Sequence, residues 1–317
     1  MFLARFGISA AMILAGLTLA PQHCLASDNA SPAPQIASAG AANLNISPRR
    51  VIFEGAKRTE AVYVFNQGTA PVTVDVTLAD NVMLPSGEIV PVEKVGEKGP
   101  EAAAVAAKLH SARNLILATP SRLTLLPGRG KTIRLRADAP DAAAGASEFR
   151  THLVVTSLPS PDMGLTADAA AATQPGVLVM RVQALFGVSI PLIVRSGGAG
   201  ATASLGAIAI EHDMAPPANG QPARQVPVLA MSLGRAGAAS VYGNIEVRSS
   251  TSAAKGGKSG ELIGLIRGIA VYPEIERRQV RVALIREPRR GETLTATFFV
   301  DDGRPGSELA RKSLTVP

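Results

Sequence analysis

Residues 178–190 read Leu-Val-Met-Arg-Val-Gln-Ala-Leu-Phe-Gly-Val-Ser-Ile, and this stretch points to the fold class. Every even-numbered residue in it is apolar, whereas the odd-numbered residues are mixed. Side chains alternate between the two faces of a β-strand, so the pattern predicts a strand with one apolar face about 40 Å long, at about 3.3 Å per residue. An ordinary strand has only about 5–6 residues. Part of the predicted strand over residues 178–190 must pack in the protein's own core. The rest either packs there too or forms an edge that pairs with a strand of a partner protein.

The composition indicates a β-rich protein with a sizeable core. The chain has 317 residues, of which 46% are hydrophobic and 18% charged, with a net charge of +7 spread along its length. That length suits two domains of about 100–200 residues each, and the apolar content excludes a disordered chain. The single cysteine, Cys24, excludes a disulfide framework, a paired-cysteine redox site and a cysteine-rich zinc site.

The first 26 residues are predicted to be a secretory signal peptide. Arg5 supplies the positive charge, an apolar run covers residues 7–20, and Ala26 followed by a serine is a small-residue cleavage point. An uncleaved N-terminal membrane anchor is the alternative. Cleavage after Ala26 would leave a mature chain without cysteine, and residues 27–43 would then form a flexible leader rich in Ala, Ser and Pro. We therefore expect an exported protein.

Short strand patterns separated by Gly and Pro turns occur on both sides of one linker. Residues 72–78 alternate between Val or Leu and polar residues, which is the pattern of a half-buried strand. Residues 101–113 are rich in alanine and predict a short inserted helix. The linker is residues 196–200, Ser-Gly-Gly-Ala-Gly. We predict an all-β fold with two β-sandwich domains in tandem, covering residues 44–195 and 201–317. Further strands are predicted at residues 61–65, 132–136, 153–156, 205–210, 226–233, 241–247, 262–272, 280–285 and 294–300.

Motifs for catalysis and metal binding are incomplete in this chain. Gly130-Lys131-Thr132 is similar to the end of a phosphate-binding loop, but Leu125 occupies the position that requires a glycine. His110, His152 and His212 are far apart in sequence and have no cysteine partners. We therefore predict no catalytic residues, no metal site and no cofactor, and we expect that the protein is not an enzyme.

Arginines gather between residues 277 and 290. A nucleic-acid-binding surface would combine such a group with aromatic residues, which are scarce here. We interpret the group as charged strand faces and a turn, with no nucleic acid partner. Its members are Arg277, Arg278, Arg281, Arg286, Arg289 and Arg290.

Four stretches resemble PapD-like periplasmic pilus chaperones. Residues 46–55, Ile-Ser-Pro-Arg-Arg-Val-Ile-Phe-Glu-Gly, are similar to the first strand of that family. Residues 118–135 contain a Thr-Pro pair, a Leu-Pro-Gly hairpin and a following strand in the family's arrangement. Residues 148–153 resemble the strand before the family's long edge strand, and residues 186–195 resemble the end of that edge strand. The stretches follow the family's order through residues 44–195, whereas the second half agrees only in length and β character.

The resemblance implies two immunoglobulin-like domains set at an angle, with a subunit-binding cleft between them. It also implies a periplasmic chaperone that binds pilus or fimbrial subunits and works with an outer-membrane usher. Such a chaperone lends its edge strand to complete the subunit's own sandwich, and the same edge could pair two copies of the chaperone. The donor side chains would be the apolar row Val182, Ala184, Phe186, Val188 and Ile190.

An anchor for the subunit's C-terminal carboxylate is also implied by the resemblance. Arg50 falls at the family's arginine position, and a guanidinium can bind a carboxylate through two parallel hydrogen bonds. Pro191 falls at the family's lysine position and supplies no cation, which makes Arg49 the candidate substitute.

Two other classes of function stay open. One is an exported structural or protein-interaction module that keeps the chaperone-like fold and has lost the family's subunit anchor. The other is an exported hydrolase with β-sandwich accessory domains, which would carry a clustered acid/base or metal site.

Overall fold

The computed structural model describes residues 43–140, 148–159, 185–197, 200–217, 222–250, 260–301 and 305–317. The predicted signal peptide lies outside these residues, as does the predicted leader except for Asn43. Almost every element in the described ranges is a strand. Neither helix within these ranges has the length and apolarity that crossing a membrane would need.

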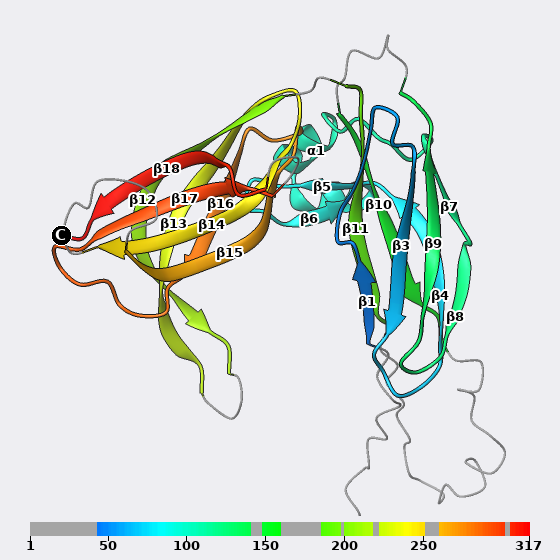
Figure 1. Ribbon diagram of the computed structural model, residues 1–317, viewed down its shortest axis with the longest axis horizontal. Helices are drawn as coiled ribbons and strands as arrows, with labels where there is room; N and C mark the ends of the chain where they lie inside the picture. The colour runs from blue at the N-terminus through cyan, green and yellow to red at the C-terminus, as the bar shows by residue number, and fades with distance from the viewer. Residues whose placement is uncertain are drawn as a thin grey trace, which may run out of the picture.

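The first domain consists of two facing sheets (Figure 1). One sheet has the order β1 (Leu44–Ser47), β3 (Thr59–Asn66), β9 (Gly130–Ala137) and β7 (Ile116–Thr119). The other has the order β2 (Val51–Glu54), β11 (Gly187–Arg195), β10 (Glu148–Ser157), β4 (Val72–Ala79) and β8 (Arg122–Leu125). The inward-facing Val, Leu and Ile side chains of both sheets form one core.

The N-terminal stretch 44–54 contributes to both sheets of this domain. β1 pairs antiparallel with β3, and after a short turn β2 pairs parallel with β11. The chain therefore crosses from one sheet to the other between Ser47 and Val51. This crossing determines how much of β11 is covered.

The second domain also consists of two sheets. The first has the order β12 (Ala201–Ala215), β13 (Arg224–Gly237) and β16 (Arg277–Ala283). The second has the order β15 (Glu261–Val271), β14 (Val241–Ser250), β17 (Thr293–Val300) and β18 (Glu308–Thr315). Its core is built mainly from β13, β14, β15 and β17.

The two sandwiches are set at an angle to each other and meet at one end (Figure 1). The predicted all-β fold, with two immunoglobulin-like sandwiches in tandem, is confirmed.

An insertion between β4 and β7 is more elaborate than the sequence predicts. It contains β5 (Asn81–Met83), β6 (Ile89–Pro91), the 3₁₀ helix η1 (Val92–Lys98) and α1 (Pro100–Ala106). The predicted helix over residues 101–113 is too long, because α1 ends at Ala106. The backbone of residues 110–112 instead pairs with β10, where the Arg150 amide donates to the His110 carbonyl at 2.8 Å.

Candidate functional site

β11 has one edge that is only partly covered. On one side it pairs with β10 along its whole length, from Gly187 to Arg195. On the other side β2 pairs with it only from Leu192 to Arg195. Among the described residues, no strand pairs with this side of β11 between Gly187 and Pro191. This half of β11 therefore forms an open strand edge, and we use that name for residues 187–191.

The antiparallel pairing defines which backbone groups point toward the open edge. The Ser157 amide donates to the Phe186 carbonyl at 2.7 Å, so these two opposite residues form a hydrogen-bonded pair. Hydrogen-bonded and non-hydrogen-bonded pairs alternate along an antiparallel ladder. Counting from Phe186, the amides of Gly187 and Ser189 point away from β10, toward the open edge. The open edge therefore presents two backbone N–H donors.

The described part of the predicted donor row becomes more buried along the strand. Phe186 is 38% exposed, Val188 is partly buried against the core of the first domain, and Ile190 is 2% exposed within that core. Ile190 therefore packs inside its own domain, and the prediction that it faces a partner does not fit this structure. The other two predicted donor residues, Val182 and Ala184, lie outside the described residues. Of the described row, Phe186 is the side chain most available to a partner.

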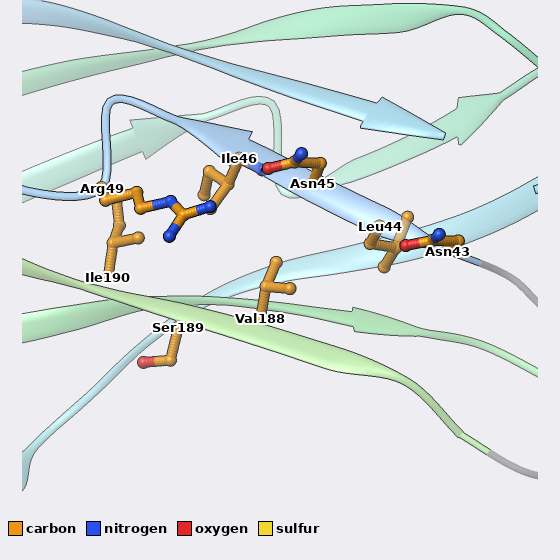
Figure 2. A pocket seen from close by; sticks show the side chains of 8 residues that line it. All are labelled: Asn43, Leu44, Asn45, Ile46, Arg49, Val188, Ser189 and Ile190. Carbon is orange, nitrogen blue, oxygen red and sulfur yellow. The ribbon is translucent and has the colours of Figure 1, made fainter. Parts of the chain in front are cut away.

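A groove of about 520 Å³ separates the open edge from β1. Figure 2 shows Val188 and Ile190 on the face of β11 that points toward β1, whereas Ser189 points to the opposite face. The exposed Arg49 side chain extends into this space from the end of β1 (Figure 2). The lining residues are Asn43, Leu44, Asn45, Ile46, Arg49, Val188, Ser189 and Ile190. The groove thus places one cation beside the unpaired backbone of β11.

Arg50 points to the second domain. Its Nη2 donates to the Ser240 hydroxyl at 3.0 Å, and its guanidinium lies 4.6 Å from the ring centroid of Tyr242. Tyr272 contributes a second ring at 6.0 Å. The two neighbouring arginines therefore have different surroundings: Arg49 lies in the groove, and Arg50 lies at the domain junction.

Pro191 lies where the open edge ends and the pairing with β2 begins. It is opposite His152 in β10, and by the same alternation its nitrogen points away from β10. Proline has no N–H to donate, so it causes no loss of hydrogen bonding to β10 at this position. His152 is buried, and the cost of desolvation, together with the nearby Arg150 charge, lowers its pKa to about 3. The imidazole is therefore neutral at neutral pH.

The end of β11 is attached to the second domain by polar contacts. Arg195 Nε donates to Glu148 Oε2 at 2.9 Å, and the same oxygen accepts hydrogen bonds from the backbone amide and hydroxyl of Ser240. Arg195 Nη2 also donates to the Ser240 hydroxyl at 3.2 Å. Sequence reasoning missed Ser240, because it lies in the half of the chain where the resemblance supplies no motif.

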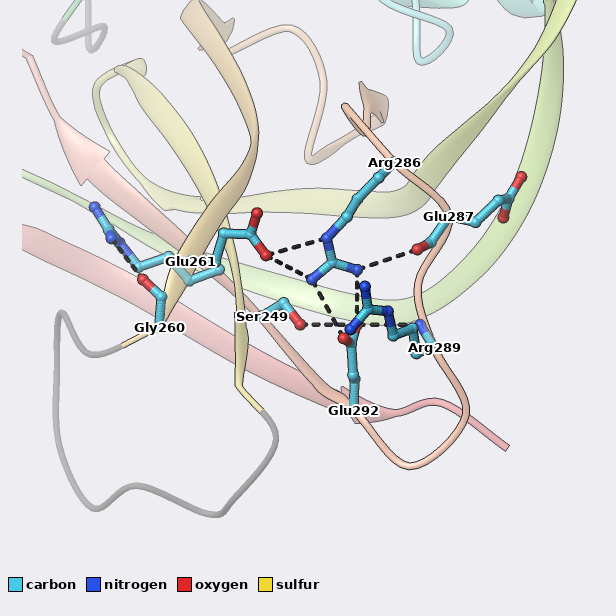
Figure 3. A network of polar contacts seen from close by, with 8 residues as sticks. Ser249, Gly260, Glu261, Arg286, Glu287, Arg289 and Glu292 are labelled. Carbon is cyan, nitrogen blue, oxygen red and sulfur yellow. Dashed lines mark hydrogen bonds and ion pairs between the residues drawn. The ribbon is translucent and has the colours of Figure 1, made fainter.

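Two arginines of the basic group in the second domain, Arg281 and Arg286, form ion pairs within the chain. Arg286 bonds to Glu261 and Glu292, and Glu292 also accepts from Ser249 (Figure 3). The hydrogen bond from Arg286 is the main reason that the pKa of Glu292 falls to about 2. Arg281 pairs with two carboxylates of β12. Arg281 lies on strand β16 and Arg286 lies in the segment after it, which agrees with the interpretation as charged strand faces and a turn.

No group of metal-ligating side chains gathers within the described ranges. The nearest polar partner of His212 is Glu287, at 2.9 Å on the surface. The structure does not bring this histidine together with His110 or His152.

Searches for a matching family model and for a similar curated protein found none. Solved structures of chaperones are similar to this chain. The crystal structure of the YadV chaperone is 14% identical, with 86% of this chain and 99% of that chain covered and a TM-score of 0.38.

Two further structures show the same level of similarity. The E. coli chaperone DraB is 12% identical over 87% of this chain and 97% of that chain, with a TM-score of 0.39. A pre-assembly complex of CsuC with the tip adhesion subunit CsuE, from Csu pili of Acinetobacter baumannii, is 12% identical over 87% and 99%, also with a TM-score of 0.39.

Proposed function

We propose that this protein is a periplasmic chaperone that binds pilus or fimbrial subunits through the open edge of β11. The proposal is supported above all by the two backbone N–H donors, Gly187 and Ser189, that this edge presents beside the exposed Phe186. An unpaired strand edge can accept an extended segment of another chain, with main-chain hydrogen bonds supplying affinity and side-chain pockets supplying fit. The sequence resemblance implies a specific form of this interaction, in which the edge strand completes the incomplete β-sandwich of a subunit.

The side chains of the predicted donor row contribute unequally to such binding. Phe186 would enter the subunit's apolar groove, and burying a side chain of this size stabilises a complex by up to about 1.5–3 kcal/mol. Val188 adds part of its surface, whereas Ile190 stabilises the chaperone itself. Val182 and Ala184 remain in the proposal as the continuation of the row.

The carboxylate anchor of the proposal is Arg49. Its side chain lies in the groove next to the open edge, where the end of a paired subunit strand would arrive. Arg50, the family's position, already bonds to Ser240 and stacks on Tyr242. For Arg50 to bind a subunit carboxylate, it would need to exchange these contacts.

Export to the periplasm, delivery to an outer-membrane usher and pairing of two free copies belong to the same proposal. An open strand edge is prone to unwanted pairing, so a free chaperone would benefit from covering it. Two copies that pair edge to edge would cover each other's open edge until a subunit displaces one of them.

Replacing Ser189 by proline tests whether subunits bind through main-chain hydrogen bonds to the open edge. Ser189→Pro removes one outward N–H donor and leaves the bonds to β10 in place, as Pro191 does two residues later. The matched control Ser189→Ala changes the side chain and keeps the donor. Each tagged variant is expressed in the protein's own organism and recovered from the periplasm, and the bound polypeptides are identified by mass spectrometry. We expect pilus subunits with the wild type and Ser189→Ala, and their loss with Ser189→Pro. Equal recovery with all three would refute edge pairing.

One observation favours the alternative of an interaction module without a carboxylate anchor, namely the engagement of Arg50 by the second domain. Arg49→Ala separates the two functions. A loss of subunit recovery supports the anchored chaperone, whereas unchanged recovery supports a module that binds through the strand edge alone.

A further inference from the structure

The insertion of residues 81–112 contacts both domains. At its base it is bound to β10 of the first domain: Arg150 Nη1 donates to the Asn81 carbonyl at 2.9 Å, and the Ala112 amide donates to the Arg150 carbonyl at 3.1 Å. Next to the base, the Thr151 hydroxyl donates to Asp80 Oδ1 at 2.8 Å. The insertion is therefore fixed to the first domain at both of its ends.

Between these two ends, the part of the insertion around the β5–β6 turn reaches the second domain. The Gln279 amide, at the start of β16, donates to the Pro85 carbonyl at 2.7 Å. At the β5–β6 turn, Gly87 has a φ of 88° and lies so close to Arg278 that an added Cβ would overlap the guanidinium. The Met83 side chain is buried in the core of the second domain. In Figure 1 the insertion correspondingly lies where the two lobes meet.

Glu274 connects the insertion, the first domain and the second domain. It lies between β15 and β16 with a side chain only 2% exposed. One of its oxygens, Oε1, accepts from the Met83 amide at 3.1 Å and from Arg150 Nη2. The Arg150 guanidinium also lies 4.0 Å from the ring centroid of Tyr272 in the second domain. One buried carboxylate of the second domain therefore bonds both to β10 of the first domain and to the insertion.

We propose that the insertion is a brace that holds the two domains in a single relative orientation. Domains joined only by a flexible linker move relative to each other by default, unless a large apolar interface prevents it. Here the insertion adds a backbone hydrogen bond from Gln279 to Pro85 and the apolar side chain of Met83. The Met83 amide also bonds to Glu274, which at the same time forms the buried ion pair with Arg150 of β10. Separating the domains would break the Arg150–Glu274 pair and the hydrogen bond from the Met83 amide to the same carboxylate.

The brace also positions the open edge of β11. Ile193, in the half of β11 that pairs with β2, is buried in the core of the second domain. Holding the domain orientation therefore fixes where the open edge lies relative to the second domain. The brace itself does not depend on what the edge binds, so the proposal stands apart from the proposed chaperone function.

Distance measurements between spin labels test the brace in the full chain. The single cysteine is replaced (Cys24→Ser), and labels are attached at Leu117→Cys in β7 and Ile285→Cys after β16, both highly exposed positions. In this background Glu274→Gln removes the shared carboxylate charge. Its matched control, Glu276→Gln, makes the same change two residues away on the surface. Circular dichroism checks that each variant is folded.

We expect a single narrow distance distribution in the parent chain and in Glu276→Gln, and a broadened or shifted distribution in Glu274→Gln. If Glu274→Gln does not fold, a second variant and its control test the proposal instead. Gly87→Ala disturbs only the tip of the brace against Arg278, whereas Gly55→Ala imposes a similar backbone strain at a turn with open space around it. Broadening in Gly87→Ala and not in Gly55→Ala supports the brace. An unchanged distribution in every folded brace variant, or equal broadening in a control, overturns it.

Discussion

Arg195 at the end of β11 and Glu148 at the start of β10 form an ion pair, with 2.9 Å between Nε and Oε2. The pair belongs to the first domain, yet the same Glu148 oxygen accepts the Ser240 amide of the second domain at 3.0 Å. The Glu148 side chain is almost fully buried, so little of this carboxylate charge is screened by water. The strand that carries the open edge is thus tied to the second domain at its other end.

Replacing Glu148 by alanine should strongly destabilise the protein. The change leaves the mostly buried Arg195 guanidinium without this carboxylate and Ser240 without its acceptor, and breaking a buried pair costs about 3–5 kcal/mol. The free energy of unfolding, measured with urea, checks this. The control is Glu308→Ala, which removes the exposed partner of Arg311 and should cost about 0–1 kcal/mol. Similar losses in both variants would contradict the role assigned to Glu148.

The buried His152 should make the protein less stable as the pH falls. Its pKa is about 3 in the folded state and 6.5 as an unperturbed side chain. Between these values the unfolded chain binds a proton that the folded chain does not bind, so acidification favours unfolding. The contribution is fully present above pH 6.5 and disappears progressively toward pH 3, with a slope of at most about 1.4 kcal/mol per pH unit.

His152→Gln should remove this slope between pH 6 and pH 5. That window lies above the range in which Glu292 titrates, because its pKa lies at about 2 when folded and 4.5 when unperturbed. Unfolding with urea at several pH values measures the slope in both proteins. A variant as pH-dependent as the wild type would show that other groups are responsible.

Phe186→Asp should abolish subunit recovery and leave the first domain stable. Phe186 is partly exposed, so a charge there costs the free protein little, whereas it would place an unpaired carboxylate in the subunit's apolar groove. Recovery of subunits from the periplasm and the free energy of unfolding are measured on the same preparation. Leu117→Asp serves as the control, since Leu117 is 62% exposed in the same domain and lies on β7, at the edge of the other sheet. If both variants recover subunits as the wild type does, Phe186 is not part of the binding row.

The strands that could be predicted are those with one buried face. Residues 72–78 alternate strictly, and β4 has its valines buried and its threonines and Asp75 at least partly exposed. The sequence gives no such signal for β18, which lies at the edge of its sheet and exposes most of its side chains. Its residues Glu308, Arg311 and Lys312 have the composition of a loop, and only pairing with β17 makes them a strand.

The candidate site was predictable only in part. The apolar alternation drew attention to Phe186 and Val188, and the resemblance drew attention to Arg49 and Arg50. Neither could distinguish the two arginines, because the contacts that hold Arg50 come from Ser240, about 190 residues away. The burial of Ile190 was also not predictable, since alternation shows which residues share a face and not where that face becomes covered.

Pro191 sets an end point for any strand that pairs with the open edge. Ser189 is the last residue there with an outward N–H, and from Leu192 onward the place beside β11 is already occupied by β2. An incoming strand can therefore gain no further hydrogen bonds from β11 amides in that direction, whatever its own length. A partner with a longer pairing segment can extend it only in the opposite direction, past Phe186. One end of the paired segment is therefore fixed for every partner, whereas the position of its other end can vary.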